Sequence, residues 1–163
     1  ASYVGNNTLC AQNEVLKLIT YVGDRQVVEE ADVSLLTAQE QEGNIFTFTD
    51  ALGERNSKAA MQQFMLLMED NDLLELTGMI HRQFRLLIQA REILDAGGKP
   101  QDIEQELGVL GFVARKLSDQ ARRFSMRQLL DIYDRLLKID LDMKSGGTPG
   151  DVAYELLIAD LTS

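Results

Sequence analysis

Apolar residues recur every three to four positions through most of this chain, which is the spacing that places side chains on one face of an α-helix. The pattern is longest in two segments, which run from Asp72 to Gly97 and from Ser125 to Gly146. Their apolar positions are Leu73, Leu76, Ile80, Phe84, Leu87, Ile88 and Ile93 in the first, and Leu129, Leu130, Tyr133, Leu136, Leu137, Ile139 and Leu141 in the second. The periodicity therefore predicts an all-α protein.

Residues typical of helix ends mark where these two helices begin and stop. A side chain that accepts a hydrogen bond at the start of a helix, followed three residues later by Glu or Gln, forms a capping box. Glycine commonly ends a helix. The capping-box spacings are Asp72 with Glu75 and Ser125 with Gln128, and the glycine stops are residues 97–98 and 146–147.

Shorter helices are predicted before, between and after the two long ones. Asn56 or Ser57 caps the first, Pro100 suits the first turn of the second, and Thr148, Pro149 and Asp151 suggest a cap, a first-turn proline and a first-turn acid for the last. For residues 45–52 a strand is an alternative to a helix. The predicted helices are residues 56–68, 100–107, 112–124 and 148–161.

A polar run at residues 39–43 ends in glycine and marks the predicted domain boundary. Residues 44–163 then form the principal domain, with about six helices joined by short connections, as in a compact helical bundle. Residues 1–40 hold a predicted helix at 7–21 and a brief one at 30–36, which are too small to bury a core alone. The four methionines Met61, Met65, Met68 and Met79 are assigned to core packing.

The charge balance limits the partners that the chain can have. Its formal net charge is −10, with 26 acidic and 16 basic residues. Because polyphosphate binding needs a concentrated positive field, broad adhesion to nucleic acid or to an anionic membrane is not expected. No window approaches eighteen consecutive apolar residues, and the single cysteine, Cys10, has no internal disulfide partner. These features favour a cytoplasmic protein.

The sequence lacks the residues that most catalytic and metal sites require. His81 is the only histidine and Cys10 the only cysteine, so a multi-histidine or thiolate zinc site cannot form. His81 lies inside the longest predicted helix, where a partly exposed surface or interface residue is the favoured interpretation over a catalytic base. No glycine-rich phosphate loop is present. We therefore predict no catalytic, metal-binding or cofactor-binding residue, and no cofactor.

One segment is basic within this acidic chain. Residues 111–127 contain five cations against a lone Asp119. One interpretation is a solvated face that neutralises acidic neighbours such as Glu104 and Glu106, and the other is an interface for an acidic partner subunit or a phosphate backbone. Lys144, in a later turn, is added to the second interpretation. The candidate interface residues are Arg115, Lys116, Arg122, Arg123, Arg127 and Lys144.

Several short motifs follow one another along almost the whole chain. Near the start, Gly5-Asn6-Asn7 precedes a helix with the pattern Glu-x-x-Lys-Leu-x-x-Tyr. Each motif is short, so the shared order and spacing carry the information. The motifs are Gly5-Asn6-Asn7 with Glu14, Lys17, Leu18 and Tyr21; Asn44-Ile45-Phe46 with Asp50-Ala51 and Ala59; Arg82-Gln83-Phe84-Arg85-Leu86-Leu87; Gly111-Phe112-Val113-Ala114-Arg115-Lys116; Ala121-Arg122-Arg123-Phe124; and Asp140-Leu141 with Lys144-Ser145-Gly146.

Their order resembles the C-terminal part of the delta subunit family of the bacterial DNA polymerase III clamp loader. The chain departs from the family at Asn7, where Asp is frequent, and at Leu16, where Glu is frequent. The resemblance implies that residues 1–40 are the end of the small helical lid domain of an AAA+ protein. It implies that residues 44–163 are the helical collar domain, through which the subunits assemble.

The resemblance also implies a function. Such a subunit does not hydrolyse ATP, although the parent holoenzyme is a DNA-directed DNA polymerase. Its expected partners are the other clamp-loader subunits through the collar, the sliding clamp through an N-terminal domain that this sequence lacks, and primed DNA in the assembled complex. The alternatives are a helical adaptor or regulatory domain unrelated to replication and a small helical hydrolase, for which no catalytic set is found.

Overall fold

The computed structural model describes residues 15–16, 18–23, 27–29 and 43–163. The chain divides into two compact units, Ala1–Asn44 and Ile45–Ser163. In the first unit, residues 15–16 and 18–22 are helical, and the side chain of Val22 is buried. The remainder of the helix predicted at residues 7–21 and all of the helix predicted at 30–36 lie outside the described residues. The second unit holds the long helices.

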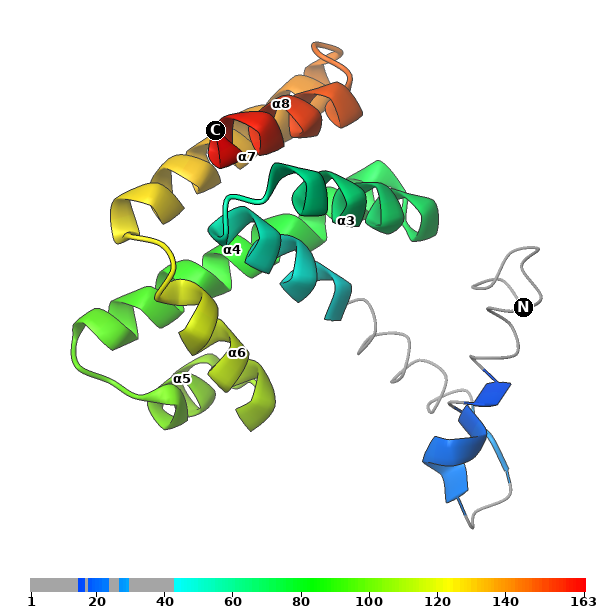
Figure 1. The fold of residues 1–163 in the computed structure, drawn as a ribbon, viewed down its shortest axis with the longest axis vertical. Helices are drawn as coiled ribbons and strands as arrows, with labels where there is room; N and C mark the ends of the chain where they lie inside the picture. The colour runs from blue at the N-terminus through cyan, green and yellow to red at the C-terminus, as the bar shows by residue number, and fades with distance from the viewer. Residues whose placement is uncertain (1–14, 17, 24–26, 30–42) are drawn as a thin grey trace. The chain divides into compact units, whose positions relative to one another are not determined.

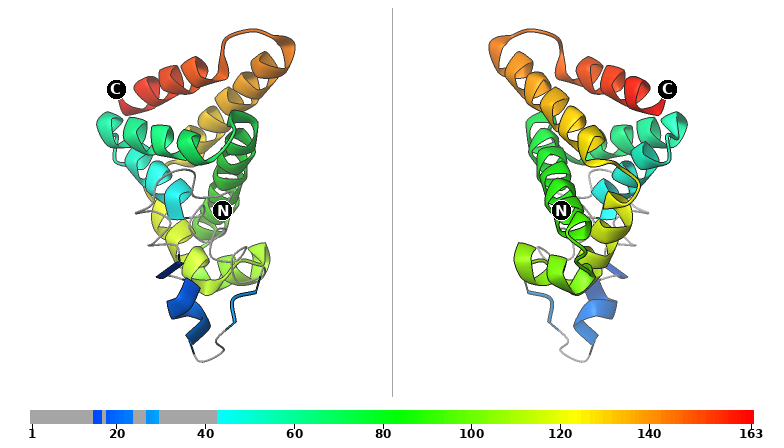
Figure 2. Two further views of the ribbon diagram at one scale, coloured as in Figure 1. Left: turned by 90° about the vertical axis from the view of Figure 1, so that its right-hand side faces the viewer. Right: turned by 90° about the vertical axis from the view of Figure 1, so that its left-hand side faces the viewer.

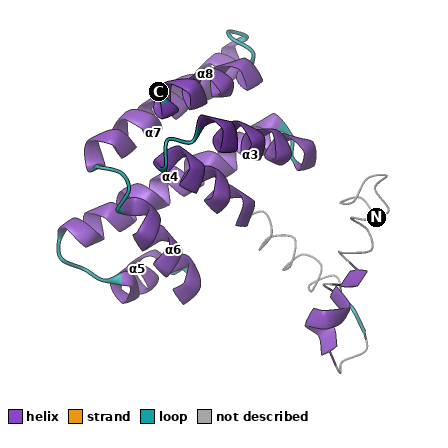
Figure 3. Cartoon of the chain, viewed as in Figure 1, coloured by secondary structure: helices purple, strands orange, loops and turns teal. Residues whose placement is uncertain are grey.

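The prediction of an all-α fold is confirmed, since every regular element in the described part of the chain is a helix (Figures 1 and 3). The segment for which a strand was an alternative is helical at residues 43–53. The helices that follow are α3 (Ser57–Asp70), α4 (Leu73–Asp95), α5 (Pro100–Leu107), α6 (Gly111–Ala121), α7 (Met126–Ser145) and α8 (Gly150–Thr162).

Helix α4 is the element around which the second unit is built. Helices α3, α5, α6 and α7 all pack against it, while α8 packs on α3 and α7. Two views at right angles to the first place α5 near one end of α4 and α8 near the other (Figure 2). Because α4 carries apolar residues at helical spacing, its buried side serves several neighbours at once.

The helix starts follow from the predicted caps, with one exception. Asn56 Oδ1 accepts a hydrogen bond from Ala59 N at 3.1 Å, and Asp72 Oδ1 accepts bonds from two backbone N–H groups at 2.9 Å. At α7 the reciprocal bonds between Ser125 and Gln128 complete the predicted capping box. These side chains satisfy N–H groups that the first helical turn leaves unpaired.

The start of the last helix differs from the prediction. Helix α8 begins at Gly150, so Pro149 occupies the N-cap position rather than the first turn, and no side chain caps the helix. A Cβ atom at Gly150 would lie 2.7 Å from both Leu73 Cδ2 and Met143 Sδ. The absence of a side chain at Gly150 therefore lets α8 begin against α4 and α7, a tertiary contact that local capping signals do not reveal.

The basic helix also ends earlier than predicted. Helix α6 stops at Ala121, and Arg122 and Arg123 form a turn before Phe124. The core accounts for this break, because the Phe124 ring packs edge-on against Phe84 of α4, with ring centroids 6.3 Å apart. Burying Phe124 turns the chain from α6 into α7.

The core is apolar except for a few polar side chains, which bond one another or the backbone. Gln83 Nε2 of α4 donates to Gln120 Oε1 of α6 at 2.9 Å, and Gln120 Nε2 donates to the Phe46 carbonyl oxygen at 2.8 Å. Both glutamine side chains are almost fully buried. Because a buried amide without partners is costly, this chain of bonds holds the helix of residues 43–53, α4 and α6 in one arrangement.

A second buried bond joins α4 to α8. The Tyr154 hydroxyl donates to Thr77 Oγ1 at 3.1 Å, and the Tyr154 ring stacks at a tilt on Phe64 of α3, with ring centroids 5.3 Å apart. Burial raises the pKa of Tyr154 to about 12, with a further contribution from the charge of Asp140, while the bond to Thr77 acts in the opposite direction.

Met65, in contrast to the prediction for the methionines, is 53% exposed.

We expect Gln120→Ala to lower the free energy of unfolding by about 2–4 kcal/mol, because it leaves the Gln83 amide and the Phe46 carbonyl without their partner and opens a small cavity. Urea denaturation measures the change. The control is Gln105→Ala, at an exposed position of α5, which should change stability by less than about 0.5 kcal/mol. Equal effects of the two substitutions would contradict the role given to the buried amides.

Tyr154 predicts a loss of stability at alkaline pH. An unfolded tyrosine titrates near pH 10, whereas the folded residue keeps its proton to about pH 12. Its contribution is therefore complete below pH 10 and is lost between pH 10 and 12, by about 2–3 kcal/mol. The Tyr154→Phe variant should be less stable than the wild type at pH 8, by about 1 kcal/mol, and should lack this share of the alkaline loss. Parallel pH profiles for the two proteins would contradict the prediction.

Candidate functional site

The structure divides the predicted basic interface into separate groups. Arg123 Nη1 lies 2.7 Å from Glu54 Oε1 and 3.3 Å from Asp50 Oδ1, and Lys116 Nζ lies 3.7 Å from Asp50 Oδ2. These two cations therefore neutralise acids on the helix of residues 43–53 and at its end, rather than the predicted Glu104 and Glu106. Such pairs hold α6 against its neighbour and leave the two side chains less available to a partner.

Arg115 of α6 and Arg122, which caps the end of α6 with helical backbone angles, lie along a different line. They are exposed and stand on either side of Asp119, four residues after the first and three before the second. Side chains at this spacing lie on one side of a helix. Neither arginine forms an ion pair with any residue in the described ranges. Together with Arg127, they are the cations of residues 111–127 whose charge is not used within the described fold.

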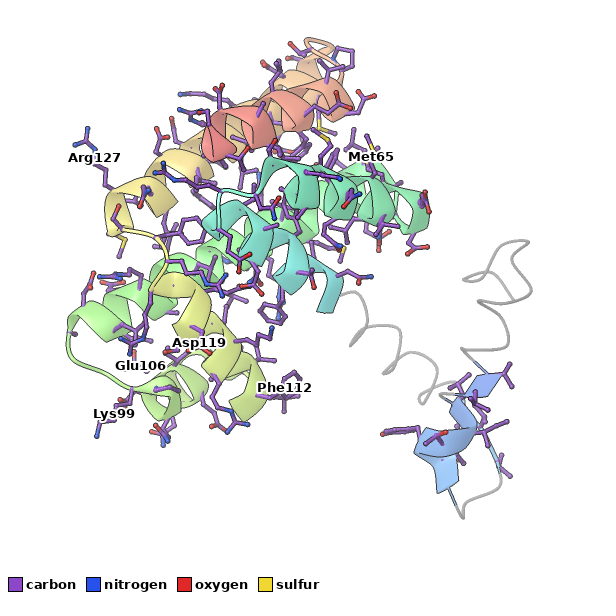
Figure 4. All side chains as sticks on the ribbon, viewed as in Figure 1. Met65, Lys99, Glu106, Phe112, Asp119 and Arg127 are labelled. Carbon is purple, nitrogen blue, oxygen red and sulfur yellow. The ribbon has the colours of Figure 1, made fainter. Side chains whose placement is uncertain are left out.

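Arg127 and Lys144 occupy opposite ends of α7. Arg127 extends from the start of the helix away from the ribbon, apart from Phe112 and Asp119 of α6 (Figure 4). Lys144 Nζ is bonded to Asp140 Oδ2 at 2.7 Å in the last turn. At 1.5 Å per residue the two positions are about 26 Å apart along the helix axis. The candidate residues therefore do not form one continuous surface.

Four exposed leucines form a feature that the apolar pattern did not separate from the core. Leu130, Leu137 and Leu141 of α7 are 52%, 42% and 64% exposed, and Leu74 of α4 is 61% exposed. Leu129 and Leu136, which belong to the same predicted apolar face, are fully buried. We call the four exposed leucines the α4–α7 face. The signal for them in the sequence was the breadth of the apolar pattern on α7, because at 100° per residue it extends beyond the side that packs on the core.

His81 lies at the contact between α4 and α7. Its ring is partly buried, with its centroid 5.9 Å from that of the Tyr133 ring. Its Nε2 atom is buried and has no hydrogen-bond partner among the described residues. A general base must lie within hydrogen-bond reach of the substrate proton that it removes. The Nε2 atom of His81, which is buried against the Tyr133 ring, does not meet this condition.

Two hollows lie on the second unit. One, of about 140 Å³, is lined by Arg55, Arg123 and Phe124 among others, and is smaller than the roughly 300–1,000 Å³ usual for small-molecule sites. A larger and more open one, of about 500 Å³, lies between α4 and α5 and includes Asp102 and Glu106.

Within the described ranges, no group of three His, Cys, Asp or Glu side chains could hold a metal ion. None of the described helices combines the length and apolar composition of a membrane span.

A helical unit that exposes leucines, and arginines without ion pairs in the described ranges, has surface features typical of a macromolecule-binding domain. The sequence model of the family described as "DNA polymerase III delta subunit, C-terminal domain" matches residues 42–161. The chain belongs to this family, which confirms the resemblance found in its motifs.

Two comparisons with individual proteins agree. The chain is 32% identical over 149 residues to the DNA polymerase III subunit delta of Bacillus subtilis strain 168, a match that covers 91% of this chain and 43% of that protein. The solved structure of the Bacillus subtilis DNA clamp loader delta protein is similar with a TM-score of 0.72 and 30% identity, over 99% of this chain and 48% of that one. The chain thus spans less than half the length of these relatives, and an adaptor unrelated to replication is not favoured.

The two adjacent arginines should differ in their effect on stability. Arg123→Glu places a carboxylate beside Asp50 and Glu54, so we expect it to lower the free energy of unfolding by about 1–2 kcal/mol at low salt, and by less at high salt. Arg122→Glu should change it by less than about 0.5 kcal/mol. Urea denaturation at two salt concentrations measures both. A larger loss for Arg122→Glu would refute the assignment of the ion pairs.

Proposed function

We propose that this chain is part of a non-catalytic subunit of the clamp loader of bacterial DNA polymerase III. The observation that carries the proposal is the family match over residues 42–161, which coincides with one helical unit, Ile45–Ser163. The similarity to the Bacillus subtilis DNA clamp loader delta protein supports it. In this proposal residues 44–163 are the collar domain and residues 1–40 are the end of the lid domain.

The proposed role of the collar is to hold subunits together. A helical bundle with a close-packed core is rigid enough to keep attached modules at a fixed spacing. Movements driven by ATP hydrolysis in other subunits would then be transmitted to the sliding clamp instead of being lost in the joints. The bundle transmits force in this scheme, and the bond-breaking chemistry takes place in the other subunits.

The proposed partners are the other loader subunits through the collar, the sliding clamp through a more N-terminal part of the whole protein, and primed DNA in the assembled complex. The complex would act in the bacterial cytoplasm, at replication forks. The formal charge of −10 supports protein contacts as the main ones, since free duplex DNA would be repelled except near local cations. Arg115 and Arg122 are the cations best placed for a local acidic contact.

The experiment is an assembly assay with the protein at its natural length. Sedimentation velocity with the purified loader subunits from the same organism should show one defined complex. The double variant Arg115→Glu with Arg122→Glu should weaken assembly at least tenfold, because both charges lack an acidic partner in the described fold. The matched control is Lys58→Glu with Lys99→Glu, which changes the charge equally at exposed positions of α3 and before α5.

The possible results distinguish failure of the proposed function from a wrong assignment of the interface residues. Failure of the unsubstituted protein to join the loader subunits would refute the proposed function. Normal assembly of the double variant, together with normal assembly of the unsubstituted protein, would remove Arg115 and Arg122 from the interface and leave the function intact.

A further inference from the structure

The four leucines of the α4–α7 face lie on one continuous surface. On α7, Leu130, Tyr133, Leu137 and Leu141 follow one another at intervals of three or four residues, which places them along one side of the helix. Tyr133 in that row contacts His81 of α4, and Leu74 lies two helical turns before His81. The row on α7 therefore borders the row on α4.

The direction of the two helices brings Leu74 to the end of the α7 row. His81 contacts Tyr133, and Thr77 Oγ1 lies 3.8 Å from Met143 Sδ, so α4 and α7 run in opposite directions. The N-terminal turn of α4 thus adjoins the C-terminal turns of α7. The leucines form a ridge along α7 that is extended by Leu74 of α4.

No helix of the second unit covers this ridge. Arg135, two residues before Leu137, points toward α8, where its Nη1 lies 3.2 Å from Asp160 Oδ2. Residues two apart in a helix point about 160° away from each other, so Leu137 faces away from α8. Exposed leucines gathered on one side of a folded unit mark an interaction surface more often than scattered ones do.

The edges of the α4–α7 face carry unpaired positive charge. Arg127 lies three residues before Leu130, and Arg85 lies four residues after His81. Both are exposed, and neither forms an ion pair within the described ranges. Among the acids of α7 near this face, Asp134 bonds Lys138 at 2.6 Å and Asp140 bonds Lys144 at 2.7 Å. Asp142, beside Leu141, is exposed and forms no ion pair within the described ranges. A partner meets leucines that are bordered by two free arginines at the Leu130 end and by Asp142 at the Leu141 end.

We infer that the α4–α7 face is the docking site for an amphipathic helix of a neighbouring loader subunit, with an apolar stripe bordered by acidic residues. A ridge of side chains spaced three and four apart along a helix fits the grooves of another helix. Acidic residues on that helix would pair with Arg85 and Arg127. The inference rests on the proposed function and deepens it by assigning a surface and a partner chemistry distinct from the Arg115 and Arg122 line.

Two other occupants fit the face less well. A phosphate backbone would use the arginines but would leave the leucines in water. A second copy of this chain would have to bring together two proteins that each carry a formal charge of −10. An acidic amphipathic helix uses both the apolar and the charged side chains of the face.

The test is the same assembly assay with the protein at its natural length and purified loader subunits. Leu137→Glu with Leu141→Glu should weaken assembly at least tenfold while leaving the thermal unfolding midpoint nearly unchanged, since both side chains are exposed. Arg127→Glu should weaken it several-fold and reduce its dependence on salt. The control is Leu156→Glu, at a position of α8 that is 61% exposed.

Three outcomes would overturn the inference and leave the proposed function standing. One is assembly of the Leu137→Glu, Leu141→Glu protein with unchanged affinity. Another is an equal loss with Leu156→Glu, which would show that any added charge disturbs the complex. The third is a dimer of the protein alone that the leucine substitutions convert to monomer, which would make a second copy the occupant. If even the unsubstituted protein does not join the loader subunits, the proposed function fails and the inference fails with it.

Discussion

The arrangement of the helical unit depends on one buried side chain, Gln120, which bonds two other helices at once. Its amide oxygen accepts from Gln83 at 2.9 Å, and its amide nitrogen donates to the Phe46 carbonyl at 2.8 Å. Apolar packing alone allows helices to slide past one another, because the hydrophobic effect and dispersion are non-directional. A buried amide has directional bonds and pays a large cost when they are broken, so it fixes where α6 stands against α4 and the helix of residues 43–53.

That placement decides which charges remain for a partner. Once α6 stands beside the helix of residues 43–53, Lys116 and Arg123 reach Asp50 and Glu54 and are used within the fold. Arg115 of α6 and Arg122, in the turn that follows it, point along another line and keep their charge free within the described residues. An interface built on this segment would therefore use Arg115 and Arg122 and not Lys116 and Arg123.

The apolar residues of α7 likewise fall into two groups, one buried and one exposed. One side of the helix fills the core against α4 and α8, and another leaves leucines in solvent beside Arg127. A protein that worked alone would gain little from that exposed side. A subunit that assembles through its helical domain, as we propose for this chain, needs such surfaces in addition to a stable core.

The sequence by itself determined the helices, because periodicity, capping residues and glycine stops act locally: α4, α5 and α7 begin and end close to where these signals predict. It also determined the family, through the order of its motifs. Tertiary structure alone decided that residues 43–53 form a helix, that α8 begins at Gly150, and which arginines and leucines stay free. Those outcomes depend on which helices meet, and contacts such as Arg123 with Glu54 join residues far apart in the chain.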